Sequence, residues 1–235
     1  MSPPPSRRAD AHASGYARPV SSSFAFACLF ALVPLLVGEL RGWWWLRAPS
    51  KVFASLCFIA FGLASGGETS VAGRFGLVAL VCSLVGDVLL LWRQTLPFAA
   101  GLFAFLLAHV AYICALSVLG PTPWVVIAAL VPLSLIGGQV WGWTGPRLGR
   151  LTAPVVAYLI VISTMVGFAI GVAAGRADAP GLFLFGAATA FWTSDVCVAR
   201  ERFVEPGPSN RLIGLPLYYV AQLGFAYALP LAGAS

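Results

Sequence analysis

Residues 74–92, RFGLVALVCSLVGDVLLLW, form a nearly unbroken apolar stretch in which only Arg74 and Asp87 carry charge. As a helix that rises ~1.5 Å per residue, the stretch spans roughly 30 Å, the thickness of the hydrocarbon core of a membrane. Arg74 lies at its start, whereas Asp87 lies well inside it. The stretch therefore predicts a membrane-spanning helix that holds one carboxyl group within the bilayer.

Stretches of the same kind recur along almost the whole sequence. Hydrophobic residues make up 60% of the 235 residues and charged residues only 9%, against about 25% charged residues in a soluble domain. This composition excludes a water-soluble globular protein and predicts an all-α integral membrane protein. The net charge of +6 comes from basic residues scattered over short loops. That pattern is typical of membrane topology, so we expect no nucleic-acid partner.

Eight membrane-spanning helices are expected in a single bundle. Breaks at charged residues, prolines and glycines place them at residues 23–40, 49–65, 74–92, 98–119, 123–140, 151–173, 180–199 and 212–232. Residues 1–22 are rich in Pro, Ser, Ala and Arg, and are expected to form a disordered tail before a transmembrane domain over 23–235. The longest expected connection, from Arg200 to Arg211, leaves no room for a soluble domain. Any chemistry must then occur within the bundle or at its rim.

The basic residues also predict an orientation. Nine lysines and arginines fall in the loops that follow odd-numbered helices, and five fall on the other side. Because the more basic loops stay in the cytoplasm, both termini are expected outside, with the bundle in the inner membrane of a bacterium. Tryptophans typical of an interfacial belt cluster at the same face: Trp43, Trp44, Trp45, Trp92, Trp141 and Trp143.

Two aspartates are the candidate catalytic residues. Asp87 lies about 13 residues into the third expected helix, and Asp195 lies about 15 residues into the seventh. A charged side chain near the bilayer centre costs about 2.5–3.5 kcal/mol on insertion scales, so such residues are usually functional. Both helices run in the same direction, which puts the two carboxyls at similar depth. We expect them to share one site and to hold one proton between them.

Further polar side chains fall at a compatible depth in the neighbouring helices, and they predict a polar pocket that faces the interior of the bundle. They are Lys51, His109, Tyr112, Tyr158, Tyr218, Tyr219 and Gln222. Asp87 is followed at +22 by His109, and Asp195 at +23 by Tyr218. This echo suggests two four-helix repeats related by an axis along the membrane normal.

Other interpretations of the same residues stay open. The aspartates could pair with basic residues only to hold helices together, His109 could be a packing group, and the tyrosines could be interface anchors. The pair would also suit a proton-coupled transporter of small molecules or lipids, and a purely structural membrane protein is a third possibility. One histidine and two aspartates are too few ligands for a catalytic zinc, so neither metal nor cofactor is expected.

Several short segments, in their order and spacing, together resemble the YhhN family of eight-span membrane proteins. The segments are CSLVGDVLLLW at 82–92, GxxxFxxxHxxY at 101–112, APVVAY at 153–158, TSD at 193–195, RF at 202–203 and YYVAQ at 218–222. The resemblance implies the activity of the characterised vertebrate members, which are lysoplasmalogenases. It marks Asp87 and Asp195 as the catalytic pair. As pocket residues it implies Lys51, His109, Tyr112, Tyr158, Ser194, Tyr218, Tyr219 and Gln222.

The reaction that this resemblance implies is hydrolysis of the vinyl ether of a lysophospholipid to a fatty aldehyde and a glycerophospho-alcohol. Vinyl ethers hydrolyse through rate-limiting protonation of carbon, so the enzyme needs an acid that keeps its proton near neutral pH. Carboxyl groups in apolar sites meet that requirement. We expect one Asp to act as the acid and the other, ionised, to stabilise the oxocarbenium ion. Lys51 at the inner rim is expected to meet the substrate phosphate.

Overall fold

Eight α-helices make up the bundle in the computed structural model, which describes residues 19–92 and 94–234 and contains no strand over these residues. All eight are long and apolar enough to cross a membrane, which confirms the predicted all-α membrane fold. They are α1 (Pro19–Arg41), α2 (Trp44–Ala64), α3 (Val71–Leu89), α4 (Thr95–Val118), α5 (Pro123–Thr144), α6 (Thr152–Arg176), α7 (Ala179–Phe203) and α8 (Pro208–Gly233). Two short 3₁₀ turns, η2 (Gly145–Arg147) and η3 (Gly149–Leu151), connect α5 to α6.

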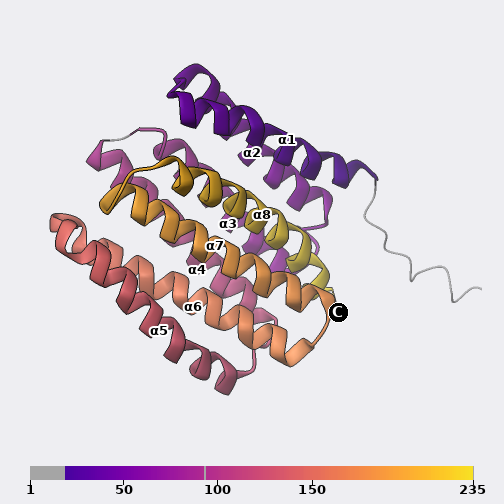
Figure 1. Cartoon of the computed structure of the whole chain (residues 1–235). Coiled ribbons are helices and arrows are strands. Elements are labelled where there is room, and N and C mark those ends of the chain that lie inside the picture. The colour runs from indigo at the N-terminus through magenta and orange to yellow at the C-terminus, as the bar shows by residue number, and fades with distance from the viewer. Residues whose placement is uncertain (1–18, 93, 235) are drawn as a thin grey trace, which may run out of the picture.

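Consecutive helices run in opposite directions, so α1 starts and α8 ends at the same end of the bundle (Figure 1). We call that end the terminal end, and the end that carries the loops after α1, α3, α5 and α7 the odd-loop end. The pairs α1 with α2, α3 with α4, and α7 with α8 pack most extensively. Helix α8 also packs against α1, α2 and α3. Its position lets it contribute side chains to a site built from several helices.

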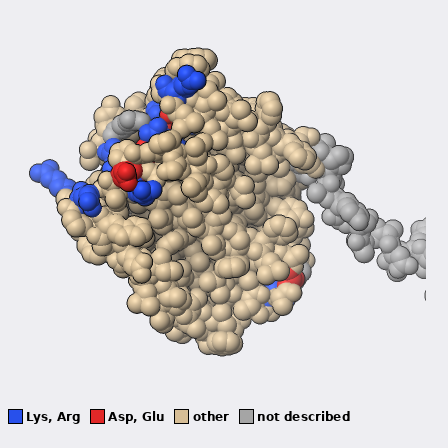
Figure 2. All heavy atoms as spheres, in the orientation of Figure 1, with Lys and Arg blue, Asp and Glu red and all other residues tan. Residues whose placement is uncertain are grey.

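Charged side chains on the surface visible in Figure 2 gather at the two ends of the bundle. On the face that Figure 2 shows, lysines and arginines gather at the odd-loop end with a few acidic residues, and a small charged patch lies at the opposite end. The surface between them is formed by uncharged residues. This apolar band with polar ends is the surface that a bilayer requires.

Several helices extend beyond the apolar limits that the sequence predicts, whereas α3 ends at Leu89, before the expected residue 92. Helix α2 begins at Trp44 instead of residue 49, and α7 and α8 reach so far that only residues 204–207 connect them. Helix α1 begins at Pro19, inside the expected tail, while residues 1–18 lie outside the described part. Hydropathy marks where a helix enters lipid, whereas the backbone stays hydrogen-bonded through the polar interface, so the helices are longer than their apolar cores.

Small residues let the helices near the site approach closely. A Cβ atom at Gly214 of α8 would lie 2.9 Å from Cys197 Cβ of α7, and one at Gly224 would lie 2.9 Å from Ala187 Cβ. A Cβ atom at Gly86 of α3 would lie 2.6 Å from the ring of Phe105 on α4. These contacts are tighter than any side chain larger than hydrogen allows, as is common where membrane helices pack.

Candidate active site

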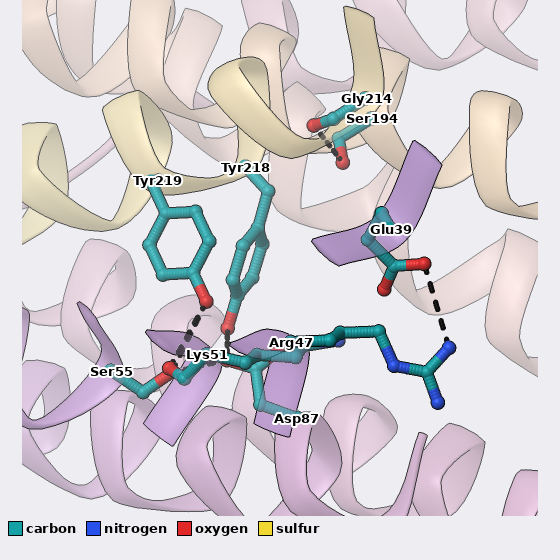
Figure 3. A network of polar contacts seen from close by, with 9 residues as sticks. All are labelled: Glu39, Arg47, Lys51, Ser55, Asp87, Ser194, Gly214, Tyr218 and Tyr219. Carbon is teal, nitrogen blue, oxygen red and sulfur yellow. Dashed lines mark hydrogen bonds and ion pairs between the residues drawn. The ribbon is translucent and has the colours of Figure 1, made fainter. Parts of the chain in front are cut away.

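The first carboxyl, Asp87, lies two residues before the end of α3 and is 2% exposed. Its Oδ2 accepts hydrogen bonds from Ser55 Oγ at 2.7 Å and from Tyr218 Oη at 2.6 Å. The ammonium group of Lys51 lies 3.3 Å from its Oδ1. Helices α2, α3 and α8 therefore meet at one fully partnered carboxyl (Figure 3).

The spacing of residues along α2 explains how this helix supplies two partners. Lys51 and Ser55 are four residues apart, so they lie one turn apart on the same face. Tyr219 of α8 supports that face, since its hydroxyl donates to the carbonyl oxygen of Lys51 at 3.3 Å and lies 3.5 Å from Ser55 Oγ. Lys51 itself is buried against Asp87. The structure therefore does not place it at the open rim where the sequence analysis expects it.

The second carboxyl, Asp195, belongs to α7 and has different partners. Its Oδ2 accepts a short hydrogen bond from the hydroxyl of Tyr158 on α6. His109 of α4 lies with its Nε2 3.8 Å from the same oxygen. The Asp195 side chain is 19% exposed, whereas that of Asp87 is 2% exposed. Asp195 is thus the more accessible of the two carboxyls and has no cation of fixed charge beside it in the described part of the chain.

An aromatic ring lies between the two groups of side chains. The ring of Phe191 on α7 is 5.4 Å from that of Tyr218 and 4.6 Å from that of His109, measured between centroids. No hydrogen bond joins Asp87 to Asp195 among the described residues, because each carboxyl is bonded within its own cluster. The structure therefore does not show the direct contact that sharing of one proton between the two carboxyls would need.

Several buried polar atoms next to these clusters have no hydrogen-bond partner within the described residues. They are both ring nitrogens of His109, Nε2 of Gln222 and the hydroxyl oxygen of Ser83. The other end of the Gln222 amide is satisfied, since its Oε1 accepts from Tyr112 Oη at 2.6 Å. An unsatisfied buried polar group costs about 1–3 kcal/mol. Unpaired atoms of this kind gathered near two carboxyls indicate where a polar ligand group or water would bind.

Ser194, the neighbour of Asp195, is bonded away from both clusters. Its hydroxyl donates to the carbonyl oxygen of Gly214 on α8 at 2.9 Å (Figure 3), and the side chain is buried. This bond joins α7 to α8 at the residue next to Asp195. The hydrogen bond therefore uses the Ser194 hydroxyl within the bundle, and the expected substrate contact of Ser194 stays a prediction.

The contacts of the two aspartates follow a crossed pattern. Asp87 is contacted from the preceding helix α2 and from α8, the last helix of the second half of the chain. Asp195 is contacted from the preceding helix α6 and from α4, the last helix of the first half. Helix α2 packs against α8 and α6 against α4 in the same manner. A parallel repeat of four helices predicts such an exchange.

Sequence reasoning missed two members of the site. Ser55 could have been found, because it follows Lys51 by four residues and so shares its face. Phe191 is one of many phenylalanines in apolar runs, and no sequence signal separates it from the others. Among the described residues, no group of three His, Cys, Asp or Glu side chains could hold a metal ion.

The fold and the two buried carboxyls define a multi-pass integral membrane protein with a polar site inside its bundle. The chain belongs to the YhhN family, whose model matches residues 46–229. It is 29% identical over 198 residues to lysoplasmalogenase TMEM86B of Homo sapiens, with 84% of this chain and 73% of that protein covered. It is 30% identical over 197 residues to lysoplasmalogenase TMEM86A of Homo sapiens, with 76% of each chain covered.

A bacterial relative is similar over a shorter range. Lysoplasmalogenase of Mycobacterium tuberculosis is 33% identical over 154 residues, which cover 62% of this chain and 55% of that protein. No solved structure matches the chain. The family match begins at residue 46, so it contains all the side chains of both carboxyl clusters but not α1.

Proposed function

We propose that this protein hydrolyses the vinyl ether of a lysoplasmalogen, a lysophospholipid with an alkenyl chain at sn-1. The products are a fatty aldehyde and a glycerophospho-alcohol with a choline or ethanolamine headgroup. The names of its relatives support the class of reaction. The observation that carries the proposal is the pair of carboxyls inside the bundle, one beside a lysine and the other beside a tyrosine and a histidine.

The chemistry requires a proton donor first and a water molecule second. Protonation of the β-carbon of the vinyl ether forms an oxocarbenium ion, which water attacks to give a hemiacetal. The hemiacetal collapses to aldehyde and alcohol. One proton is added to carbon and one is taken from water, so the carboxyl pair ends in its starting state. Glycosidases divide the same tasks between two carboxyl groups, although they protonate oxygen.

The different partners of the two aspartates support a proposed division of roles. Asp195 is the proton donor, because it has no fixed cation beside it and is the more exposed carboxyl. Asp87 is the ionised group that stabilises the oxocarbenium ion, since Lys51, Ser55 and Tyr218 all stabilise a carboxylate. The unpaired nitrogens of His109 and Gln222 are suited to hold the attacking water or the ether oxygen.

The position of the site also favours one direction of substrate entry. Asp87 and Lys51 both lie near the odd-loop end, where the basic side chains and tryptophans gather. A lysophospholipid that enters from that leaflet would keep its headgroup at this end and its alkenyl chain among the apolar helices. We propose that this leaflet is the cytoplasmic one, with both termini outside, because the odd-numbered loops carry more basic residues.

A comparison of two lipids tests the proposal. Purified protein in maltoside detergent is incubated with a choline lysoplasmalogen and with its 1-alkyl analogue, which lacks the double bond, and free aldehyde is measured. The alkenyl lipid should release aldehyde and the alkyl lipid none, because only a vinyl ether can be protonated on carbon. Absence of aldehyde from both lipids would reject the hydrolase. Proton-dependent uptake of lipid or small molecules into proteoliposomes would then support the transporter alternative.

A further inference from the structure

A second polar group lies at the odd-loop end and takes no part in the chemistry proposed above. Glu39, near the end of α1, and Arg47, in the first turn of α2, form a loose ion pair, with Arg47 Nη1 3.6 Å from Glu39 Oε2 (Figure 3). The two side chains are only 13% and 15% exposed. They lie at the boundary between the bundle interior and the polar interface.

Neither charge is fully used within the described part of the protein. Arg47 Nη2 donates to the carbonyl oxygen of Leu91 at 2.7 Å, but its Nε is buried and has no hydrogen-bond partner there. The Glu39 carboxylate accepts no hydrogen bond from any described residue and meets only the Arg47 guanidinium. A partly buried cation and anion with free hydrogen-bonding capacity form a site for a ligand that carries both charges.

Two tryptophans complete this site on the side of the interface. The Arg47 guanidinium lies over the ring of Trp44, 5.0 Å from its centroid, and the ring of Trp92 lies 5.9 Å from that of Trp44. Both rings are about two-fifths exposed, at 45% and 41%. Tryptophan faces attract ammonium groups, quaternary ones in particular.

The spacing along α2 relates this group to the carboxyl site. Arg47 precedes Lys51 by four residues on the same helix face, which places it ~6 Å nearer the odd-loop end. In a lysoplasmalogen the ether oxygen and the phosphorus are separated by the three glycerol carbons and the phosphate ester oxygen. These five bonds span about 6 Å at ~1.2 Å per bond in an extended chain. A phosphate at Arg47 would therefore put the vinyl ether at the level of Lys51 and Asp87.

We propose that Glu39, Arg47, Trp44 and Trp92 form a headgroup subsite for a zwitterionic phospho-amino-alcohol. Arg47 binds the phosphate, and Glu39 with the two tryptophan rings binds the ammonium. The inference rests on the proposed function, because it takes the substrate to be a lysoplasmalogen. Glu39 precedes the residues that the family model matches, so the group that selects a positively charged headgroup comes from outside the matched range.

Ratios of catalytic efficiency between substrates test this subsite. The substrates are a choline lysoplasmalogen, the matching alkenyl lysophosphatidic acid without an amine, and the neutral 1-alkenylglycerol. The first ratio is kcat/KM for the choline lipid divided by kcat/KM for the alkenyl lysophosphatidic acid. Glu39→Gln should lower this ratio by about tenfold. Arg47→Gln should lower the ratio of both phosphorylated lipids to the neutral one by a similar factor. Glu205→Gln is the matched control, since it removes a well-exposed carboxylate at the same end.

A ratio measured on one preparation does not depend on how much of the protein is folded, so an unstable variant still gives a result. Ratios in both variants that equal those of the unaltered protein would overturn the subsite. Arg47→Lys provides a second check. Lysine keeps the charge but lacks the planar fork of donors. The ratio of kcat/KM for the phosphorylated lipids to that for the neutral lipid should therefore lie between the values for Arg47→Gln and the unaltered protein.

Binding separates failure of the subsite from failure of the proposed function. Lysophosphatidylcholine and lysophosphatidic acid cannot react, because they have no vinyl ether. Each is added in increasing amounts to the protein in maltoside detergent, and binding is measured by the change in tryptophan fluorescence. The unaltered protein should bind the choline lipid more tightly, and Glu39→Gln should abolish that preference. If no vinyl ether is cleaved but this preference is found, the reaction is wrong and the subsite stands. Phosphocholine without a chain should bind much more weakly, and equal affinity would contradict a subsite that adjoins the hydrocarbon site.

Discussion

The hydroxyl of Tyr112 on α4 donates a 2.6 Å hydrogen bond to Oε1 of Gln222 on α8, and both side chains are fully buried. The bond joins the two halves of the chain in the middle of the polar site. Both residues lie one turn further along their helices than a residue that contacts an aspartate, His109 on α4 and Tyr218 on α8. The bond therefore holds the two carboxyl clusters in a defined relation to each other.

Removal of this hydroxyl should destabilise the bundle. Tyr112→Phe removes the hydrogen bond to Gln222 Oε1 and leaves this buried oxygen without its donor. The expected loss is about 1–3 kcal/mol of unfolding free energy, measured by thermal unfolding in detergent. Tyr227→Phe is the control, since no hydrogen bond of the Tyr227 hydroxyl is found in the described structure. Equal stability of the two variants would show that the Tyr112 bond is not important for the fold.

Both aspartates should be required for turnover. Asp87→Asn and Asp195→Asn keep the size of the side chain but remove the acid or the negative charge, so kcat should fall by roughly 10²–10⁴-fold in each. Asp178→Asn, at the terminal end of the bundle, should leave kcat unchanged. Activity is measured as aldehyde release, and folding is checked by gel filtration. A folded variant at either site with near-normal kcat would remove that residue from the mechanism.

The ion pair of Lys51 and Asp87 should be strongly coupled. Lys51→Met leaves a buried carboxylate without its cation and should cost about 3–5 kcal/mol. Addition of Asp87→Asn should restore most of that stability, because the unpaired charge is then gone. Arg200→Met breaks the exposed pair with Glu205 and should cost only about 0–1 kcal/mol. Additive effects of the two buried changes in a double-mutant cycle would contradict the ion pair.

The close approach of α3 and α4 beside Asp87 should tolerate no methyl group. A Cβ at position 86 would lie 2.6 Å from the Phe105 ring, so Gly86→Ala should lose about 1–3 kcal/mol through overpacking. Gly186→Ala on α7 is the matched control, since nothing lies within 4 Å of its added Cβ. Replacement of the Phe105 ring by a smaller side chain, in the double variant Gly86→Ala with Phe105→Leu, should recover part of the lost stability. No recovery would mean that the methyl group clashes elsewhere.

The contribution of Asp178, in the turn between α6 and α7, to the stability of the protein should depend on pH in the acid range. The Gly181 N–H, which donates to Asp178 Oδ1, and the nearby Arg176 hold the pKa of Asp178 below its ordinary value of 3.8. A lowered folded pKa stabilises the protein above the unfolded value, and that stabilisation is lost as pH falls through the folded pKa. The stability difference between the unaltered protein and Asp178→Ala should therefore shrink below pH 3.8. The stability difference between Asp178→Asn and Asp178→Ala should stay constant over the same pH range, because Asn also caps a helix but does not titrate.

The sequence by itself determined the number, order and direction of the helices. A backbone in lipid must satisfy its hydrogen bonds within each segment, so every long apolar stretch has to be a helix. The cost of a charge in the bilayer also marked Asp87 and Asp195 as the residues around which polar groups would gather. The spacing of His109 and Tyr218 after the two aspartates also predicts a four-helix repeat.

Only the tertiary structure decided which side chains meet. It paired Lys51 with Asp87, turned Ser194 toward Gly214, and placed Phe191 between the two clusters. In a soluble helix, alternation of polar and apolar residues marks the buried face. In a membrane the lipid and the protein interior are equally apolar, so the sequence does not show which face of a helix turns inward. The rotation of each helix, and with it the set of partners around each aspartate, is set by packing between helices.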